Sequence, residues 1–311
     1  MMPGPTNVGQ RKRMIVVPSL LCFLLWVMFA AAGCHSDIYV NDVPPVTEHG
    51  SATDSDVARD TATDSDVDGD TALWRPEASA RWQWQMQGEL NLEIDADLFV
   101  VDLFGTSSDT IDYIHNTDRR VICCFSVGVQ EQWTDDAEDF AAWTIGNSVQ
   151  AVQGENWVDI TAPTVREIMI QRIALARDKG CDGVAPDYMD SYLNDTGFDL
   201  SAADQIEYNR FLADTSHERG LSVGLTNDIG QTEILEPYFD WVINESCLEW
   251  DECDLLTPFL SAQKPVFHVA YTPSAAEGPS IQSQVCGDNT IAGFSTIIKN
   301  RELDDWVLFC E

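Results

Sequence analysis

The stretch G-C-D-G-V-A-P-D-Y-M-D-S-Y, residues 180–192, leads from an apolar run directly into a carboxylate. Val184 and Ala185 have the apolar character of a buried strand, and Pro186 restricts the backbone just before Asp187. Asp190 follows three residues later, in a sequence that stays acidic and aromatic. Two interpretations fit this pattern: a carboxylate held in place for catalysis, or a solvated loop after a buried strand.

Seven further apolar runs of similar length accompany this one in the domain predicted over residues 79–311. The eight runs begin at Trp82, Leu98, Val121, Gly183, Leu221, Phe239, Val266 and Ile291. Continuous apolar runs of this length are typical of strands buried on both faces, as in a parallel sheet. Helical patterns lie between several of them, with capping-box starts at Thr164 and Ser201 and helix ends at Gly180 and Gly220.

This alternation of strands and helices predicts the fold class α/β, a (β/α)8 TIM-type barrel. Only about ten polar residues join the first two runs, which is too few for a helix, so we expect an irregular first connection. A doubly wound sheet is the alternative, but no glycine-rich phosphate loop follows any of the predicted strands.

Residues 1–34 have the pattern of an export signal. Basic residues at 11–13 precede an apolar run over residues 14–32, and small residues lead to Cys34. The segment resembles a bacterial lipoprotein signal, which receives a lipid on Cys34 after cleavage; ordinary secretion and an uncleaved anchor are the alternatives. His35 is not the Asp that marks retention at the inner membrane. We therefore expect a lipid anchor in the cell envelope, at the outer membrane, or secretion if no lipid is added.

Residues 35–78 are polar, acidic and repetitive. A-T-D-S-D-V-A-R-D-T at 52–61 is followed directly by A-T-D-S-D-V-D-G-D-T at 62–71. So few apolar residues cannot bury enough surface to offset the entropy of ordering, so a disordered tether is predicted. The repeat also matches the opening of a calcium loop, but Arg75 stands where the closing glutamate is required.

The chain carries 52 acidic residues against 17 Lys and Arg, a formal net charge of −35. Residues 74–311 hold 42 of the acidic and 13 of the basic residues, so the excess is not confined to the tether. A domain this acidic repels nucleic acid and anionic headgroups and attracts cationic ligands. Solubility of an exported protein is the simpler explanation of the same charge.

Seven of the nine cysteines lie in the predicted domain, where export permits disulfides. Spacing makes Cys247 and Cys253 plausible partners, and likewise Cys286 and Cys310. Cys181 could pair with either cysteine at 123–124 across adjacent strands, which leaves one thiol over. No C-x-x-C or His-rich spacing favours zinc, and we expect neither a metal nor a cofactor.

The active site of such a barrel lies at the carboxyl ends of its strands, and the residues found there are strongly polar. They are Gln85, Asp102, Ser126, Asp187, Asn227 with Asp228, Glu245 and Tyr271. Crowding carboxylates raises the free energy, so a structural barrel has no reason to concentrate them. Asp187 and Glu245 would face each other across the mouth, as the two carboxylates of a glycosidase do.

Aromatic residues near the same strand ends would suit saccharide subsites, although core packing is the alternative for each. They are Trp82, Trp84, Trp133, Trp157, Tyr188, Tyr192 and Trp250. No G-x-S-x-G elbow is present, which argues against a serine hydrolase.

Residues 80–311 resemble glycoside hydrolase family 114, the endo-α-1,4-polygalactosaminidases. Nine blocks carry the resemblance in order: W-Q-W-Q-M-Q-G (82–88), V-D-L-F (101–104), V-I-C-C-F-S-V-G (121–128), G-E-N-W-V-D-I (154–160), K-G-C-D-G-V-A-P-D (179–187), T-G-F-D-L-S-A-A-D-Q (196–205), R-G-L-S-V-G-L-T-N-D (219–228), F-D-W-V-I-N-E-S-C-L-E-W-D-E-C (239–253) and G-F-S-T-I-I-K (293–299). The resemblance implies a (β/α)8 barrel that hydrolyses galactosamine-containing polymers without a metal. It also implies that Asp187 and Glu245 are catalytic, and we expect Asp187 to be the nucleophile and Glu245 the general acid/base.

The chain departs from the family pattern at Ala185, Tyr188, Thr226 and Cys124, where an acid, Asn, Lys and Tyr are usual. These departures do not affect Asp187 and Glu245, but they leave undetermined which sugar and which linkage the enzyme would cleave. The acidic domain fits a cationic, partly deacetylated aminosugar polymer. Candidate contacts to its ammonium groups are Asp102, Asp190, Asp228 and Glu249. A glycosidase for another polymer and a non-catalytic carbohydrate-binding protein are the alternatives.

Overall fold

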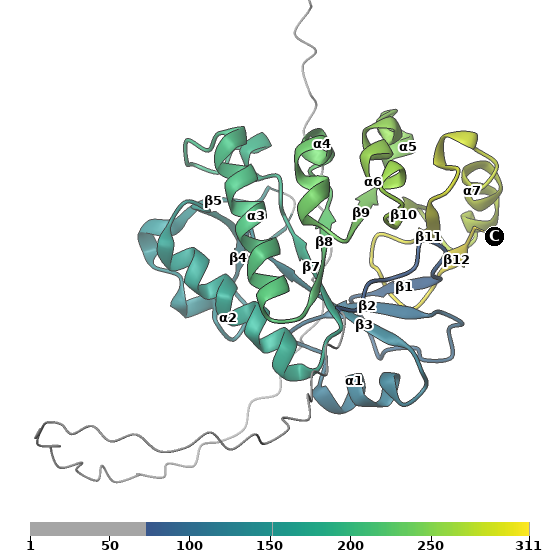
Figure 1. The fold of residues 1–311 in the computed structure, drawn as a ribbon, viewed down its shortest axis with the longest axis horizontal. Helices are drawn as coiled ribbons and strands as arrows, with labels where there is room; N and C mark the ends of the chain where they lie inside the picture. Colours follow the sequence, from purple (N-terminus) through teal and green to yellow (C-terminus); the bar gives the residue numbers. More distant parts are fainter. Residues whose placement is uncertain (1–72, 151, 311) are drawn as a thin grey trace, which may run out of the picture. The chain divides into compact units, whose positions relative to one another are not determined.

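The computed structural model describes residues 73–150 and 152–310, and these form a curled, mostly parallel sheet flanked by helices (Figure 1). Eight parallel strands follow one another in chain order: β1 (Trp82–Gln85), β2 (Leu98–Asp102), β3 (Arg120–Ser126), β7 (Gly183–Asp187), β8 (Ser222–Thr226), β9 (Trp241–Glu245), β10 (Val266–Tyr271) and β11 (Ser295–Lys299). A short β12 (Leu308–Phe309) runs antiparallel to β11. The predicted (β/α)8-type barrel is confirmed, and each predicted apolar run contributes one strand.

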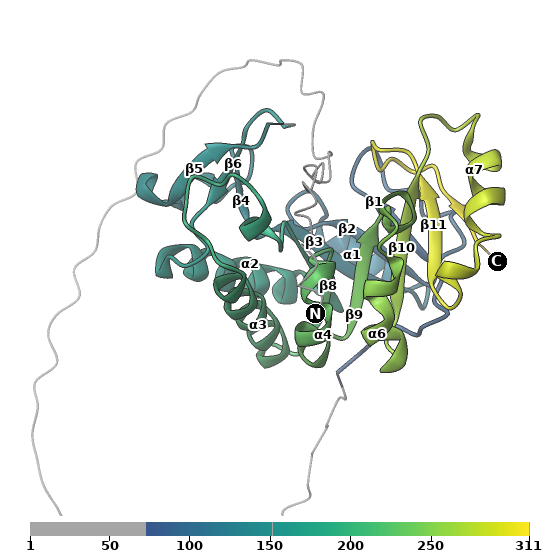
Figure 2. The ribbon, with the colours of Figure 1, turned by 90° about the horizontal axis from the view of Figure 1, so that it is seen from above.

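Helices cover the outside of the sheet and alternate with its strands along the chain (Figures 1 and 2). They are α1 (Ser108–His115), α2 (Pro163–Lys179), α3 (Ala202–Glu218), α4 (Thr232–Leu235), α5 (Cys247–Trp250), α6 (Thr257–Ser261) and α7 (Gly278–Val285), with 3-10 turns η1 (Ala137–Asp139), η2 (Ala142–Thr144), η3 (Ser191–Leu193), η4 (Ile229–Gln231), η5 (Glu236–Tyr238), η6 (Cys253–Leu256) and η7 (Asn289–Ile291). Residues 86–97, between β1 and β2, form no helix, as the short spacing predicts.

The capping signals in the sequence are partly correct. Ser201 and Asp204 form a capping box at the start of α3, and Gly180 ends α2 with a φ of 94°. The capping box predicted at Thr164 is wrong, because Pro163 already begins α2 and Ala162 is the N-cap. A proline is favourable at this first position because its missing N–H has no helical partner to lose.

An antiparallel sheet is inserted between β3 and α2, and the sequence analysis did not predict it. Its strands are β4 (Val129–Glu131), β5 (Ile145–Ser148) and β6 (Glu155–Val158), in the order β4-β6-β5. The inserted sheet stands to one side of the barrel strands in Figure 2. Arg172 of α2 is buried against it and donates to Asp136 at 2.7 and 2.8 Å and to the carbonyl of Ser126 at 2.6 Å.

Alternate residues of each strand fill two apolar cores, one inside the barrel and one under the helices. The interior core includes Trp82, Trp84, Val100, Ile122, Ala185, Trp241, Ile243, Val269 and Ile297. Trp241 occupies space that Gly183 and Gly224 leave open, since a Cβ on Gly224 would lie 2.0 Å from the indole Nε1. Among the described residues β1 and β11 share no backbone ladder, and the Trp82 indole instead donates to the Ser295 carbonyl at 3.0 Å.

Three disulfides link the cysteines in the predicted pairs: Cys123–Cys181, Cys247–Cys253 and Cys286–Cys310. Cys123 is therefore the partner of Cys181, and Cys124 takes part in none of the three. Cys124 is buried in the barrel interior, whereas Cys123 faces the helices.

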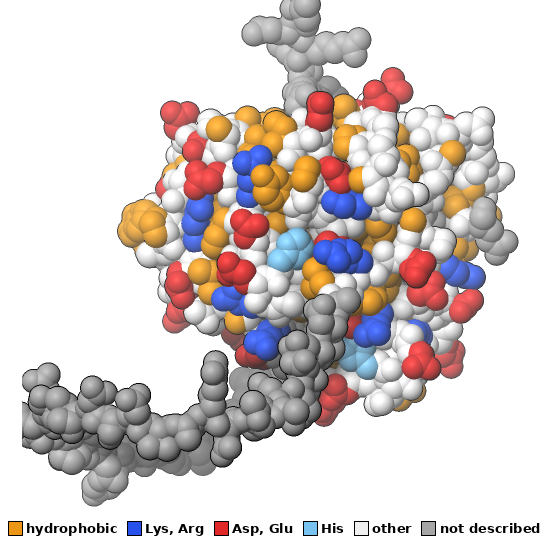
Figure 3. All heavy atoms as spheres, in the orientation of Figure 1, with side chains coloured by type: hydrophobic (Ala, Val, Ile, Leu, Met, Phe, Trp, Pro, Cys, Tyr) orange, Lys and Arg blue, Asp and Glu red, His pale blue; other side chains and the backbone are white. Residues whose placement is uncertain are grey.

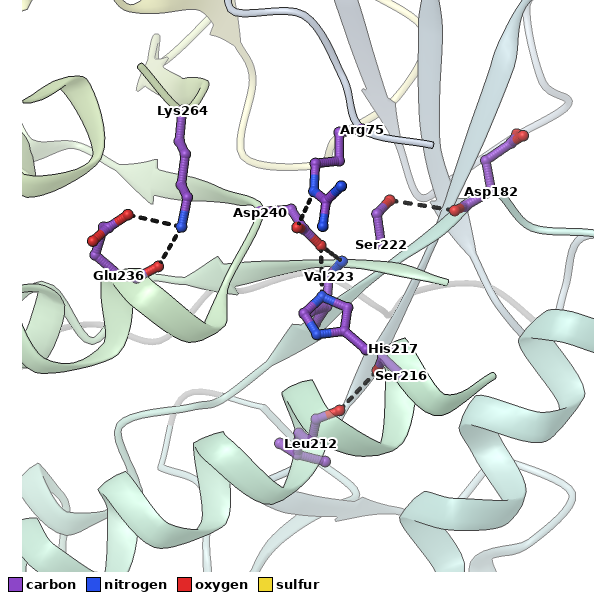
Figure 4. A network of polar contacts seen from close by, with 10 residues as sticks. All are labelled: Arg75, Asp182, Leu212, Ser216, His217, Ser222, Val223, Glu236, Asp240 and Lys264. Carbon is purple, nitrogen blue, oxygen red and sulfur yellow. Dashed lines mark hydrogen bonds and ion pairs between the residues drawn. The ribbon is translucent and has the colours of Figure 1, made fainter. Parts of the chain in front are cut away.

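Three aspartates fasten the amino-terminal ends of neighbouring strands. Asp97, Asp182 and Asp240 each precede a strand and accept the backbone N–H of the residue opposite, on the strand beside it, at 2.8, 2.8 and 3.0 Å. Asp240 also contacts Nε2 of His217 at 2.8 Å and Nε of Arg75 at 2.6 Å (Figure 4).

Residues 73–81 pack against this end of the barrel. Arg75 forms its ion pair with Asp240, and the Trp74 ring lies 6.5 Å from that of Trp241. The predicted export signal over residues 1–34, with Cys34, lies outside the described residues, as do residues 35–72 of the predicted tether. No helix in the described part of the chain is long and apolar enough to span a bilayer.

We predict that Asp240→Asn lowers the free energy of unfolding at pH 7 by about 1–3 kcal/mol, because it weakens charge-assisted bonds to a buried carboxylate. Burial acts to raise the pKa of Asp240, but bonds from His217, Val223 and Arg75 outweigh it, and the pKa is lowered. A lowered folded pKa stabilises above the unfolded value of about 4 and ceases to do so as the pH falls through the folded value. Urea unfolding from pH 7 to 3 should therefore show the deficit shrinking below about pH 4.

Asp95→Asn is the matched control, because the Asp95 side chain is 91% exposed in its contact with Arg81. It should change stability by less than about 0.5 kcal/mol. Equal unfolding free energies for Asp240→Asn and the wild type at pH 7 would contradict a stabilising role for the contacts of Asp240.

Candidate active site

The carboxyl ends of the strands bring a set of polar side chains into the barrel mouth. Since interior residues alternate along each strand, the last inward positions are Asp102, Ser126, Asp187, Thr226, Glu245, Tyr271 and Lys299. The sequence analysis identified five of these seven as site residues. Three of the seven are acids, contributed by β2, β7 and β9.

Glu245 is held by hydrogen bonds to both of its carboxylate oxygens. The Asn227 amide donates to Oε1 at 3.0 Å, and the Tyr271 hydroxyl donates to Oε2. Asn227 has a φ of 56°, and its side-chain Oδ1 accepts the backbone N–H of Glu245 at 3.0 Å. The carboxyl group is thus fixed in direction by Asn227, which follows β8, and by Tyr271 of β10.

Asp187 is partly buried at the end of β7, and its Oδ1 accepts the backbone N–H of Tyr188 at 2.7 Å. Burial raises the pKa of Asp187 well above its usual value, and the nearby charge of Glu245 raises it further. Two carboxyl groups that repel each other in this way do not both ionise easily. Asp187 therefore holds a proton more tightly than an isolated carboxylic acid would.

Tyr188 has a backbone conformation that is unusual for an aromatic residue, with a φ of 60°. Such a conformation costs about 1–3 kcal/mol and persists where surrounding contacts impose it. Its hydroxyl donates to Oε2 of Glu155 at 2.5 Å, and its ring packs edge-on against Trp157 at 5.5 Å. Gly128 makes room for it, since a Cβ there would lie 2.3 Å from the Tyr188 carbonyl oxygen.

Further carboxyl groups surround the pair, and burial is the main cause of each raised pKa. The pKa rises to about 8 for Glu131, about 7 for Glu155, about 6 for Asp190 and about 9 for Asp228. The pKa of Asp102 is also raised by burial, against a hydrogen bond from the Gly105 N–H. Because these carboxyl groups repel one another when they are ionised, a cation bound among them would be stabilised.

One pocket joins several of these groups to Asp187. Its lining includes Trp84, Met86, Asp102, Ser126, Glu131, Glu155, Asp187 and Tyr188. By contrast, acidic and basic side chains are interspersed on the molecular face shown in Figure 3. Among residues 73–150 and 152–310, no group of three or more His, Cys, Asp or Glu is arranged to hold a metal ion.

Most of the predicted substrate-binding residues lie at this mouth. Trp84, Asp102, Ser126 and Tyr188 line the pocket, and Asn227 and Tyr271 contact Glu245. Asp190 lies close enough to Glu245 to feel its charge, and the charge of Asp190 in turn acts on Asp228. Asn209 fixes Asp228 through a 3.0 Å hydrogen bond.

Gln85 and Glu249 lie differently. The Gln85 side chain donates to the carbonyls of Gln87 and Glu89 at 2.9 Å and accepts the Asn91 N–H at 3.1 Å. Its amide is therefore occupied in holding the loop after β1. Glu249 is on α5, about half exposed, with Oε2 4.0 Å from Nη2 of Arg301.

The sequence analysis did not single out Glu131, Glu155 or Lys299. Glu131 and Glu155 are opposite each other on β4 and β6 of the inserted sheet. Lys299 ends β11, is fully buried, and donates to Oε1 of Gln83 at 3.2 Å and to the Asp304 carbonyl at 2.6 Å. Burial lowers the pKa of Lys299 to about 7. Only the period-two alternation of the last strand could have pointed to Lys299.

Two interacting carboxyl groups at the mouth of a (β/α)8-type barrel are an arrangement that retaining and inverting glycosidases use. The chain belongs to glycoside-hydrolase family GH114, which residues 63–311 match. The protein is therefore a glycoside hydrolase.

Solved structures agree with this assignment. The chain is 37% identical to Aspergillus fumigatus Ega3, crystallised in complex with galactosamine, with a TM-score of 0.72 over 77% of this chain and 98% of that one. The glycoside hydrolase domain of Pseudomonas aeruginosa PelA is 16% identical, with a TM-score of 0.59 over 73% of this chain and 97% of that one, and so shares the fold. No curated protein matches the chain.

We predict that Tyr271→Phe lowers kcat about ten- to a hundredfold, because Glu245 loses the hydrogen bond from the Tyr271 hydroxyl and with it its fixed direction. The ring beneath Arg301, 4.9 Å from the guanidinium carbon, is retained. Release of reducing ends from a polysaccharide substrate measures the effect.

Tyr238→Phe is the matched control, because it also removes a tyrosine hydroxyl. The Tyr238 ring packs on Arg210, whose guanidinium carbon lies 4.4 Å from the ring centre. The variant should leave kcat within about twofold of the wild type. A Tyr271→Phe enzyme as fast as this control would show that Glu245 does not depend on the hydroxyl.

Proposed function

We propose that this protein is an extracytoplasmic glycoside hydrolase that cleaves galactosamine-containing polysaccharide within the chain, as an endo-α-1,4-polygalactosaminidase does. The observation that carries the proposal is the carboxyl pair Asp187 and Glu245, fixed at the ends of β7 and β9. The chain is also 37% identical to a protein crystallised with galactosamine.

In the proposed reaction, Asp187 is the nucleophile and Glu245 the general acid/base. Glu245 gives its proton to the glycosidic oxygen while an Asp187 oxygen bonds to the anomeric carbon and the leaving chain departs. Glu245 then takes a proton from water, whose oxygen displaces Asp187 and restores both groups. The Tyr188 N–H, 2.7 Å from Oδ1, orients the attacking carboxylate.

Burial and the charge of Glu245 disfavour the ionised form of Asp187 in the empty site. A positive charge nearby reverses this effect, because it stabilises the carboxylate. The ammonium group of a deacetylated sugar, or the oxocarbenium character of the transition state, supplies such a charge. A cationic substrate would thus help to ionise its own nucleophile.

The other carboxylates of the mouth are the proposed counter-ions for substrate ammonium groups. Asp228 is buried there, Asp102 and Asp190 are partly buried, and Glu249 lies further out on α5. The net charge of −35 would steer a polycation toward the protein. Ala185, Tyr188 and Thr226 depart from the usual residues, and this keeps another aminosugar polymer as the second candidate substrate.

We further propose that the protein is exported and lipid-anchored through Cys34, at the outer membrane. The support is the basic, apolar and small-residue pattern over residues 1–34. The acidic repeat that follows would separate the enzyme from the membrane surface.

We predict that Asp187→Asn and Glu245→Gln each lower kcat by at least about a thousandfold on partly deacetylated galactosamine polymer, because each removes a group that takes part in bond making or proton transfer. Wild-type enzyme should release oligosaccharides, detected by mass spectrometry. Unchanged thermal unfolding would show that the variants fold. Residual turnover near the wild-type rate in either variant would overturn the pair.

Sodium azide added to Asp187→Ala and Glu245→Ala assigns the two roles. A missing nucleophile should give a glycosyl azide of configuration opposite to that of the substrate, and a missing acid/base should give one of the same configuration. The reverse outcome would exchange the roles. Wild-type enzyme that cleaves a different aminosugar polymer instead would move the substrate assignment and keep the pair.

We predict that the mature protein partitions with membranes and carries lipid on Cys34, visible by mass spectrometry of its amino-terminal peptide. Cys34→Ala should release it to the soluble fraction, because the lipid provides the anchor. Cys22→Ala is the matched control and should change nothing. A soluble wild-type protein without lipid would contradict the anchor and favour secretion.

A further inference from the structure

Tyr188 connects the catalytic strand β7 to the inserted sheet β4-β6-β5. Its backbone N–H donates to Oδ1 of Asp187 at 2.7 Å, and its hydroxyl donates to Oε2 of Glu155 on β6 at 2.5 Å. Its ring packs edge-on against Trp157, two residues further along the same strand. Glu155 and Trp157 therefore hold one side chain from the same face of β6.

The backbone at Tyr188 needs this external support. A φ of 60° is the left-handed conformation, which an aromatic residue adopts only when contacts impose it. Gly128 leaves the space that the Tyr188 carbonyl occupies, 2.3 Å from where a Cβ would stand. The direction of the N–H toward Asp187 is a consequence of that conformation.

The inserted sheet is itself anchored to the barrel, so it can act as a fixed support. The Asn147 N–H of β5 donates to the Thr196 carbonyl at 2.9 Å, and the Val158 N–H of β6 donates to the Gly128 carbonyl at 3.0 Å. The segment that leads from β3 into the sheet is fixed as well, because the Tyr208 hydroxyl donates to the Val127 carbonyl at 2.7 Å. The Val127 N–H in turn donates to the Asp187 carbonyl at 2.8 Å. The support and the strand end that it holds therefore belong to one connected framework.

We propose that Glu155 is a positioning residue for the hydrolytic reaction: it acts through the Tyr188 hydroxyl to keep the Tyr188 N–H on Asp187. The inference rests on the proposed role of Asp187. It assigns a catalytic purpose to the inserted sheet.

Tyr188→Phe tests the proposal with the smallest change, because it keeps the ring on Trp157 and removes the bond to Glu155. We expect kcat on partly deacetylated galactosamine polymer to fall about ten- to a hundredfold, with KM within about twofold of the wild type, since the reacting group and not the sugar loses its placement. A matched control is Tyr113→Phe, which removes a hydroxyl from a residue 57% exposed on α1. It should leave both constants unchanged.

Substitution of Glu155 separates positioning from mere packing. Glu155→Gln keeps an acceptor oxygen and should hold kcat within about threefold of the wild type, whereas Glu155→Leu should match Tyr188→Phe. The double variant Tyr188→Phe/Glu155→Leu should be no slower than either single variant, because both remove the same interaction. Additive losses, or a slow Glu155→Gln enzyme beside a fast Glu155→Leu enzyme, would overturn the proposal.

A crystal structure of Tyr188→Phe gives a result that does not depend on the substrate. We expect residue 188 to leave the left-handed conformation and its N–H to move out of hydrogen-bonding distance of Asp187. An unchanged backbone with the 2.7 Å contact intact would overturn the inference even if the wild type cleaves the polymer. A wild type that cleaves no polymer would instead overturn the proposed function, and the crystal structure would still decide the role of Glu155.

Discussion

Burial of carboxyl groups beside one another is the constraint on which this structure depends. At the mouth, Asp187 loses solvent and faces the charge of Glu245, so its ionised form is disfavoured. Such an arrangement holds together only if the surrounding framework fixes each group, here through the amide of Tyr188, Asn227 and Tyr271. A positive charge brought into the mouth would relieve this repulsion.

At the opposite end of the barrel, aspartates are paired with basic side chains instead of with other acids. Asp182 and Asp240 each accept a strand N–H and contact an arginine and a histidine. Their charges are compensated within the protein and no ligand is needed to satisfy them. Asp182 and Asp240 at the amino-terminal ends of the strands are thus compensated by basic side chains, whereas Asp187 at a carboxyl-terminal end lies beside another acid.

The sequence predicted the barrel because its eight strands are buried on both faces and read as apolar runs. The inserted sheet escaped prediction because β4 and β6 have only three and four residues and include buried polar groups such as Gln130 and Glu155. The same reason hid Glu131 and Glu155 from the predicted site. Gln85 was assigned to the mouth from its place at a strand end, but adjacent residues of a strand face opposite sides, and Trp84 is the one that lines the pocket.

The segment before β1, residues 73–81, is attached to the end of the barrel at which the strands begin. The Trp74 ring packs against Trp241, and Arg75 forms an ion pair with Asp240. These contacts hold residues 73–81 across the amino-terminal ends of the strands. A pull applied along this segment would be resisted first by those two contacts, at the end of the barrel away from Asp187 and Glu245.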